Sequence, residues 1–329
     1  MKAAIVGLAG PALLPEESAL FQAAAPAGAI LFTRNIENPA QLAALLASLR
    51  AVLPPQARLL IDQEGGRVAR LRPPHWPARP AAARLGALHA TDPAAGLRAA
   101  WLAGALIGLD CAGFDVVCAP VLDLACPGAT PAIGDRAYAA EPARVAALGS
   151  AFAAGLLAAG IEPVAKHAPG HGRAQSDSHA GLPRIPAATP LDADAAPFRA
   201  CAGLPWMMTA HLLYESLDPA RPATLSPDII HGVIRCQIGF QGVLVSDDLA
   251  MDALTGEPGG RAAAALAAGC DLAMHCSGRL DDSRAVLAAA APATALALGR
   301  LARARARAAA RRRPLDKPAL EAELQGLLP

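Results

Sequence analysis

The chain has 329 residues, of which 54% are hydrophobic by a broad count, and its 29 basic side chains are balanced by 28 acidic ones. This length accommodates a sizeable core in one large α/β domain or in two smaller ones. A formal net charge of +1 gives no long-range field that would attract nucleic acid or an anionic membrane, and the 3% aromatic content argues weakly against a base-stacking surface.

The N-terminal segment MKAAIVGLAGPALLPEESALF could pass for a weak signal peptide, because Lys2 precedes an apolar run. Glycine and proline interrupt this run and two glutamates follow it, which favours a short strand that leads into a helix. The seven cysteines form no CxxC pair and are odd in number, as is typical of a reducing compartment. We therefore expect a cytoplasmic protein. No stretch approaches the ~18 uninterrupted apolar residues that a membrane span needs.

Short apolar runs alternate with helical segments along the rest of the chain. The runs, many of them rich in β-branched residues, are AIVGL, GAILFT, ARLLID, FDVVCAPVLDL, IEPVAKH, PWMMTAH, GVLVSDD and DLAMHC. Several of the Ala- and Leu-rich segments between them end near a glycine suited to a helix C-cap. A strand followed by a helix, repeated about eight times, predicts a parallel sheet covered by helices.

Polar residues follow nearly every predicted strand. This distribution distinguishes a closed (β/α)8 barrel from an open doubly wound sheet. These residues are Arg34, Asn35, Asp62, Asp123, Lys166, His167, His211, Asp247, Asp248 and His275. An open sheet concentrates its binding groups at one switch point, whereas a barrel presents them at many strand ends. No nucleotide-binding glycine motif follows a strand. We predict an α/β fold, a single-domain (β/α)8 TIM-type barrel over residues 1–329, with a C-terminal helical segment from about residue 300. The basic run 303–313 is expected to be the solvated face of that helix.

The run GVLVSDDLAM at 242–251 places two adjacent carboxylates, Asp247 and Asp248, after a buried strand. A rigid strand can hold a carboxylate in the mouth of a barrel. Successive strand residues face opposite sides, so only one of the pair is expected to point at a ligand. The structural alternative is a helix N-cap followed by an acid at the first helical position.

A second cluster of ionisable residues lies in the segment EPVAKHAPGHGRAQSDSHAGLP at 162–183. A long Gly-, Ser- and Pro-rich segment with this much ionisable chemistry is more often functional than structural. His167, His171 and His179 could in principle bind zinc, but the HxxxH spacing runs through proline and glycine and cannot form a helical two-histidine face. We therefore expect no metal and no cofactor.

The DSH tripeptide at the end of this segment suggests a hydrogen-bonded pair in which the carboxylate of Asp177 orients the imidazole of His179. A serine hydrolase triad is disfavoured, because Ser178 lies between the two and no GxSxG motif is present.

Four motifs together resemble those of the single-domain bacterial β-N-acetylglucosaminidases of glycoside hydrolase family 3, cytoplasmic enzymes that recycle cell-wall fragments. They are IDQEGGRVARL at 61–71, IGDRAY at 133–138, KHxPGHG with the downstream DSH at 166–179, and VIRxQ…GVLVSDDLA at 233–250. The resemblance extends from GLAG near the N-terminus through MTAHLLY at 208–214 and covers most of the chain. The related β-glucosidases are larger and take an acid/base carboxylate from a second domain that resembles nothing here.

The resemblance implies a role for each matching residue. Asp247 matches the catalytic nucleophile, and Asp248 then has a supporting role. His179 matches the histidine general acid/base of this branch, with Asp177 as its partner. The residues that match those holding the terminal N-acetylglucosamine are Asp62, Arg70, Arg136, Lys166 and His167. Plausible second-line contacts are Asp123, Arg67, His211 and Met251.

The implied activity is that of a monomeric, retaining exo-β-N-acetylglucosaminidase that acts on N-acetylglucosaminyl-anhydromuramyl peptides. A carboxylate attacks the anomeric carbon, an acid protonates the leaving oxygen, and water completes the second displacement. Three alternatives stay open: phosphorolysis, chito-oligosaccharides as the substrate, and a sugar-binding barrel without catalysis. Ala168 replaces the family's usual aromatic residue and Arg173-Ala174 replace smaller or acidic residues, which bears on loop packing and leaving-group preference.

Overall fold

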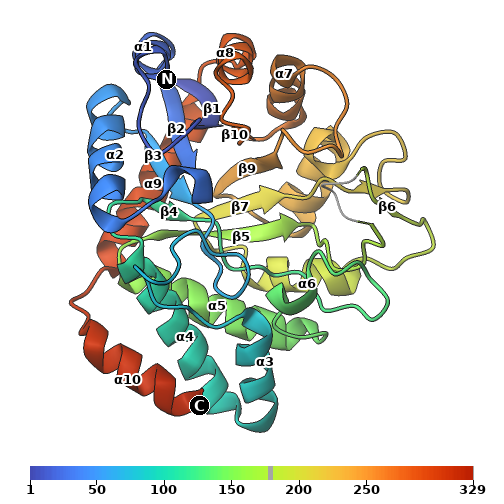
Figure 1. The fold of residues 1–329 in the computed structure, drawn as a ribbon. Helices are drawn as coiled ribbons and strands as arrows, with labels where there is room; N and C mark the ends of the chain where they lie inside the picture. Colours follow the sequence, from blue (N-terminus) through green and yellow to red (C-terminus); the bar gives the residue numbers. More distant parts are fainter. Residues whose placement is uncertain (177–180, 329) are drawn as a thin grey trace.

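A closed barrel of eight parallel strands forms the centre of the computed structural model, which describes residues 1–176 and 181–328 (Figure 1). Around the barrel the strands follow the order β1, β10, β9, β7, β5, β4, β3, β2. Their bounds are β1 Lys2–Gly7, β2 Pro26–Leu31, β3 Arg58–Ile61, β4 Val116–Val117, β5 Glu162–Ala168, β7 Trp206–Thr209, β9 Val243–Asp248 and β10 Leu272–His275. The predicted (β/α)8 TIM-type barrel is confirmed.

Helices cover the outside of the barrel, as the alternating pattern predicts (Figure 1). Their bounds are α1 Pro15–Ala24, α2 Pro39–Val52, α3 Ala82–Thr91, α4 Pro93–Asp110, α5 Pro142–Ala158, α6 Asp192–Ala200, α7 Pro258–Ala268, α8 Leu280–Ala289, α9 Ala295–Arg311 and α10 Lys317–Leu327. A π-helical segment, η4 (Ile229–Gln237), precedes β9, and a small parallel pair of strands, β6 (Arg184–Ile185) and β8 (Leu213–Tyr214), lies outside the barrel. No described helix has both the length and the apolar character that crossing a membrane requires.

The strands are apolar because both of their faces are buried. Side chains such as Ile5, Leu60, Val164 and Trp206 form a cluster inside the barrel, while alternate strand residues join a second cluster beneath the helices. Leu301, on the buried face of α9, belongs to the interior cluster. This helix therefore covers one end of the barrel.

Polar contacts identify the covered end as the one where the strands begin. Arg58, the first residue of β3, donates from Nη2 to the Leu301 carbonyl at 2.8 Å and from Nε to Glu162 at 2.9 Å. Glu162 begins β5 and also accepts from the indole of Trp206, the first residue of β7, at 2.6 Å. The amino ends of the strands are closed, so the carboxyl ends are left for a ligand.

Two glycines allow α4 and α5 to pack closely against each other. A Cβ atom on Gly104 of α4 would lie 2.0 Å from the carbonyl oxygen of Phe152, and one on Gly155 of α5 would lie 2.1 Å from that of Trp101. Both neighbours are backbone atoms and cannot rotate away.

We predict that Gly104→Ala lowers the free energy of unfolding by about 1–3 kcal/mol, because the clash with Phe152 outweighs the gain in helix propensity. The matched control is Gly260→Ala, an exposed position in α7 with no atom near the added methyl group. This variant should be neutral or more stable, by up to about 1 kcal/mol. Urea denaturation of both variants measures the difference, and equal stability of the two would contradict the packing argument.

Candidate active site

A cavity of about 290 Å³ opens where the strands end at their carboxyl termini. Its apolar wall comes from β2, β7, β10 and the chain after β4, and includes Ile30, Phe32, Cys118, Met208, Met274 and Cys276. Its polar wall contains the five residues predicted to bind sugar, together with Asp247: Asp62, Arg70, Arg136, Lys166 and His167. The predicted catalytic pair Asp177 and His179 lies outside the described residues. Seven strand ends and loops thus converge on one cavity, as in other barrels of this kind.

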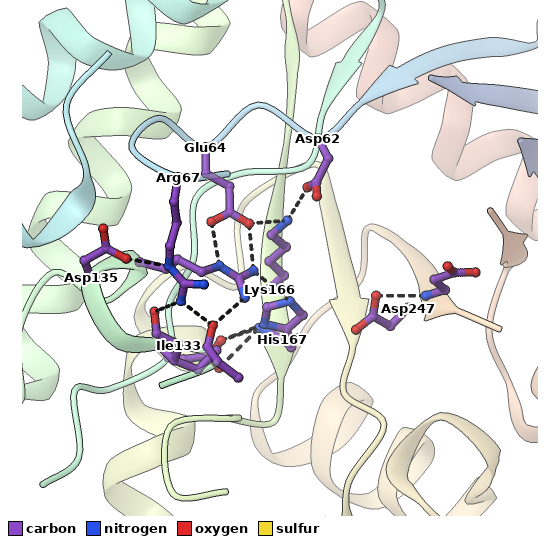
Figure 2. A network of polar contacts seen from close by, with 12 residues as sticks. Asp62, Glu64, Arg67, Ile133, Asp135, Lys166, His167 and Asp247 are labelled. Carbon is purple, nitrogen blue, oxygen red and sulfur yellow. Dashed lines mark hydrogen bonds and ion pairs between the residues drawn. The ribbon is translucent and has the colours of Figure 1, made fainter. Parts of the chain in front are cut away.

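A buried ion cluster lines one side of the cavity (Figure 2). Asp62, directly after β3, accepts from Lys166 Nζ at 2.5 Å and from Arg70 Nη2 at 2.7 Å. Lys166 Nζ also contacts Glu64 at 2.7 Å, and the two nitrogens of Arg136 bind the Glu64 carboxylate at 2.7 and 2.8 Å. Each charge in the cluster has an opposite charge beside it.

The cluster fixes the protonation states of its members. Burial opposes the charge on Asp62, but Lys166 and Arg70 outweigh it and hold the pKa of the carboxyl well below its usual range. Burial likewise opposes the charge on Lys166, but Asp62 and Glu64 outweigh it and raise the pKa of the ammonium. At neutral pH the wall therefore presents fixed charges, which bind hydroxyl groups by strong hydrogen bonds.

Glu64 is a site residue that the sequence analysis missed. Burial opposes its charge, but Lys166 and Arg136 outweigh this and lower the pKa of the carboxyl. Its position two residues after Asp62, within the IDQEGGRVARL motif, was the available signal. Its partner Arg136 is 72 residues away in the sequence, so only the folded barrel reveals the pairing.

Asp123 binds the end of β5 and the segment that follows it. Its carboxylate lies 2.7 Å from Nδ1 of His167 and accepts from the backbone N–H of His171 at 2.6 Å. Because a carboxylate can only accept, Nδ1 of His167 carries a proton and donates it. Burial opposes the charge on Asp123, but the two histidines outweigh it and lower the pKa of the carboxyl. Burial lowers the pKa of His171 to about 4, which keeps that ring neutral at physiological pH.

Asp247 and Asp248 both line the cavity but differ in their partners. One oxygen of Asp248 accepts from the backbone N–H groups of Ala250 and Cys276, each at 2.8 Å, so this carboxylate fixes the chain after β9. Asp247 accepts only the neighbouring backbone N–H of Asp248, at 2.8 Å, among the hydrogen bonds of the described residues. Burial opposes its charge, yet His167 and His211 outweigh this and lower the pKa of the carboxyl. Asp247 is thus ionised at neutral pH.

The predicted second-line contacts divide into two groups. Met251 and Arg67 line the cavity, and Arg67 also binds Asp135 at 2.7 Å and the carbonyls of residues 131–133 (Figure 2). His211 lies behind the wall, where Nε2 contacts the Asp248 carbonyl at 2.9 Å. It therefore supports the end of β9.

Three residues that differ from the family's usual ones, Ala168, Arg173 and Ala174, lie at the end of β5 and just after it. Ala168 is fully buried in β5, and Ala174 is buried as well. Arg173 donates from Nε to Asp194 of α6 at 2.6 Å. Within residues 1–176 and 181–328, no group of three or more His, Cys, Asp or Glu side chains is arranged to hold a metal ion.

Comparison with known proteins gives one consistent result. The family model described as "Glycosyl hydrolase family 3 N terminal domain" matches residues 14–312. The chain is 41% identical over 281 residues to the beta-hexosaminidase of Alkalilimnicola ehrlichii. The aligned region covers 83% of this chain and 80% of that protein. It is 37% identical over 294 residues to the beta-hexosaminidase of Pseudomonas aeruginosa, with coverages of 87% and 85%.

Solved structures agree with these sequence relatives. NagZ from Neisseria gonorrhoeae in complex with N-trifluoroacetyl-D-glucosamine superposes with a TM-score of 0.88 and 32% identity, covering 100% of this chain and 98% of that one. A glycoside hydrolase family 3 β-N-acetylglucosaminidase from a Paenibacillus strain superposes with a TM-score of 0.86 and 30% identity, covering 99% of this chain and 66% of that one.

The ion cluster leads us to predict an acid-dependent loss of stability. The pKa of Asp62 in the folded protein lies below the ordinary aspartate value. The contribution of this carboxylate to stability is therefore complete above about pH 4, and it is lost as the pH falls through the unfolded and then the folded pKa. Asp62→Asn should therefore lower the free energy of unfolding by about 1–3 kcal/mol at pH 7, and by less at pH 3.

Thermal unfolding of both proteins between pH 3 and pH 7 measures this difference. The control is Asp281→Asn, because the side chain of Asp281 is 87% exposed and its ion pair with Arg284 lies on the surface. A deficit for Asp62→Asn that is the same at every pH would contradict the lowered pKa.

Proposed function

This chain belongs to glycosyl hydrolase family 3 and acts as a β-N-acetylhexosaminidase, and from this premise we propose a specific reaction for it. The enzyme is a retaining exo-β-N-acetylglucosaminidase that removes the non-reducing terminal N-acetylglucosamine from cell-wall muropeptides through a covalent glycosyl–Asp247 intermediate. The observation that carries the proposal is the ionised Asp247 carboxylate, which shares one cavity with the ion cluster of Asp62, Arg70 and Lys166.

Binding of a single terminal sugar is supported by the size and lining of the cavity. A volume of about 290 Å³ lies at the low end of the range for small-molecule sites. Asp62, Arg70, Arg136, Lys166 and His167 offer charged and neutral hydrogen-bonding groups to the sugar hydroxyls. The N-trifluoroacetyl-D-glucosamine bound by the Neisseria protein supports the same class of sugar here.

The proposed reaction has two displacement steps. In the first, an oxygen of Asp247 bonds to the anomeric carbon while the glycosidic bond breaks, and the leaving oxygen takes a proton from the His179 imidazolium. In the second, neutral His179 removes a proton from water, the water oxygen bonds to the anomeric carbon, and the Asp247–sugar bond breaks. Asp177 orients the His179 ring and favours its protonated form. The DSH motif supports these two roles.

A place in peptidoglycan recycling, a cytoplasmic location and a monomeric state complete the proposal. All seven cysteines are free thiols, which agrees with a reducing compartment. In the described part of the chain, the exposed large hydrophobic side chains are Leu14, Leu296 and Leu298. Three such residues form no extended apolar surface of the kind that marks a stable subunit interface.

We predict that Asp247→Ala lowers kcat/KM for p-nitrophenyl β-N-acetylglucosaminide by about 10³-fold or more, because no group then attacks the anomeric carbon. Added azide should restore turnover and give the α-glycosyl azide, since the anion attacks from the side that the carboxylate vacates. The control is Asp252→Ala, an exposed aspartate close by in the chain, which should retain activity. Isolation of the β-azide, or near-normal activity without azide, would contradict the nucleophile role.

We predict that His179→Ala slows hydrolysis of substrates with poor leaving groups by about 10²–10⁴-fold, and of p-nitrophenyl substrates by less. An alkoxide leaving group needs protonation in the first step, whereas p-nitrophenolate leaves without it. The measurement is kcat/KM against leaving-group pKa for wild type, His179→Ala, Asp177→Asn and the exposed-histidine control His231→Ala. The same slope for wild type and His179→Ala would exclude the acid role.

Product analysis separates the remaining alternatives. With phosphate present, formation of N-acetylglucosamine 1-phosphate would identify phosphorolysis, whereas free sugar at all phosphate concentrations identifies hydrolysis. Relative kcat/KM values for a muropeptide and for chitobiose identify the preferred leaving group. Lack of any turnover would indicate a sugar-binding barrel.

A further inference from the structure

A second cavity, of about 340 Å³, lies away from the active site, between α4, α5, the connection from α6 to β7, and the end of α9. Its wall includes Leu204, just before β7 begins, and Ala158, where α5 ends before β5. It therefore belongs to the amino-terminal side of the barrel, opposite the catalytic cavity. Figure 1 shows the end of α9 and its connection to α10 running beside α4 and α5.

Three arginines line this cavity: Arg307 and Arg311 of α9, and Arg313 just beyond the helix. Leu301, Ala304 and Ala308 bury one face of α9 against the barrel, and Arg307 and Arg311 lie along one edge of that face, with exposed side chains. Arg307 and Arg311 are four residues apart, so they are neighbours on one helix face, and their like charges repel. An anion bound between the two side chains would relieve this repulsion.

The described part of the chain provides no carboxylate for these three arginines. Arg307 donates to the carbonyl of Gly203, and the guanidinium of Arg313 lies 4.7 Å from the centre of the Trp101 ring. Arg98, on the other hand, contacts the same ring and is neutralised by Glu323 at 2.6 Å. Burial, and then the charge of Arg311, lower the pKa of Arg307, as expected of an uncompensated cation.

The three arginines also have a structural role beside two helix ends, but this role offsets only part of their positive charge. The carboxyl ends of α5 and α6 lie at the cavity wall, and cations are favourable beside helix carboxyl ends. Each helix end is equivalent to about −0.5 elementary charge. These two ends offset part of the positive charge of the three exposed arginines, and no carboxylate of the described residues offsets the rest.

We propose that this cavity binds a small phosphorylated metabolite of sugar-phosphate size, with its phosphate group between Arg307, Arg311 and Arg313. A guanidinium has five N–H donors in a fixed fork that matches phosphate geometry, and the contacts of these arginines with Gly203 and Trp101 leave most of the donors available. The hydroxyl of Ser150, on the cavity wall, is placed for the uncharged part of the ligand. The cavity is open to solvent on one side and its three arginines are exposed, and its volume suits a small molecule better than a nucleic acid or a membrane surface.

The test is isothermal titration of the full chain with glucose 6-phosphate at low salt, with inorganic phosphate and citrate as comparison ligands. We expect glucose 6-phosphate to bind in the millimolar range or tighter, and more tightly than either comparison ligand. Arg311→Gln should weaken this binding by about tenfold or more, the loss expected for a charge-assisted hydrogen-bonding group. Arg311→Lys should bind with intermediate affinity, because it keeps the charge but loses the fork.

The matched control is Arg303→Gln, which removes the same charge from α9 at a position that does not line the cavity. Its affinity should equal that of wild type, and all variants should keep wild-type hydrolysis of the p-nitrophenyl substrate, because the active site lies at the other end of the barrel.

Four results would overturn the proposal: no binding of glucose 6-phosphate, equal binding of inorganic phosphate, equal weakening by Arg303→Gln, or binding only to a polynucleotide or anionic vesicles.

Discussion

The buried ammonium of Lys166 is the interaction on which the active site depends. Its side chain is 3% exposed, and it contacts Asp62 at 2.5 Å and Glu64 at 2.7 Å. A buried charge without partners would cost several kcal/mol, so the lysine is stable only when the end of β3 and the end of β5 are brought together. Those strands do not pair directly; β4 lies between them. The polar wall of the cavity therefore assembles when β3, β4 and β5 pair side by side.

The two ends of the barrel use polar groups for different purposes. At the amino end, Arg58 and Glu162 satisfy each other and hold α9 and Trp206 in place, which closes the interior of the barrel. At the carboxyl end, the charged groups line an open cavity and keep hydrogen-bonding capacity for a substrate. The interior of the barrel is thus closed by paired charges at the amino end and opens to a cavity at the carboxyl end.

Much of this arrangement is predictable from sequence, because strand position decides which side chains meet. Asp62, Lys166, His167 and Asp247 each follow or end an apolar run, and parallel strands in a barrel bring such positions together. The pairing of Glu64 with Arg136 was not predictable, because the loop position of Arg136 follows no periodic pattern. The π-helical form of η4 was missed for a similar reason: hydrophobic periodicity does not distinguish it from an α-helix. Roles for Asp177 and His179 stay predictions from their motif.

Asp247 differs from the other acids of the site in its ion-pair partners. Asp62, Glu64 and Asp123 each have a direct cationic or imidazole partner within 2.7 Å, which occupies their oxygens. Asp247 has no such ion pair among the described residues, and its pKa is lowered, against burial, mainly by His167 and His211 acting through space. Stabilisation through space keeps the charge without covering the oxygen lone pairs. The neighbouring acids thus bind the cations of the cavity, and the Asp247 oxygens stay outside the ion pairs of the described residues, as the proposed nucleophile role requires.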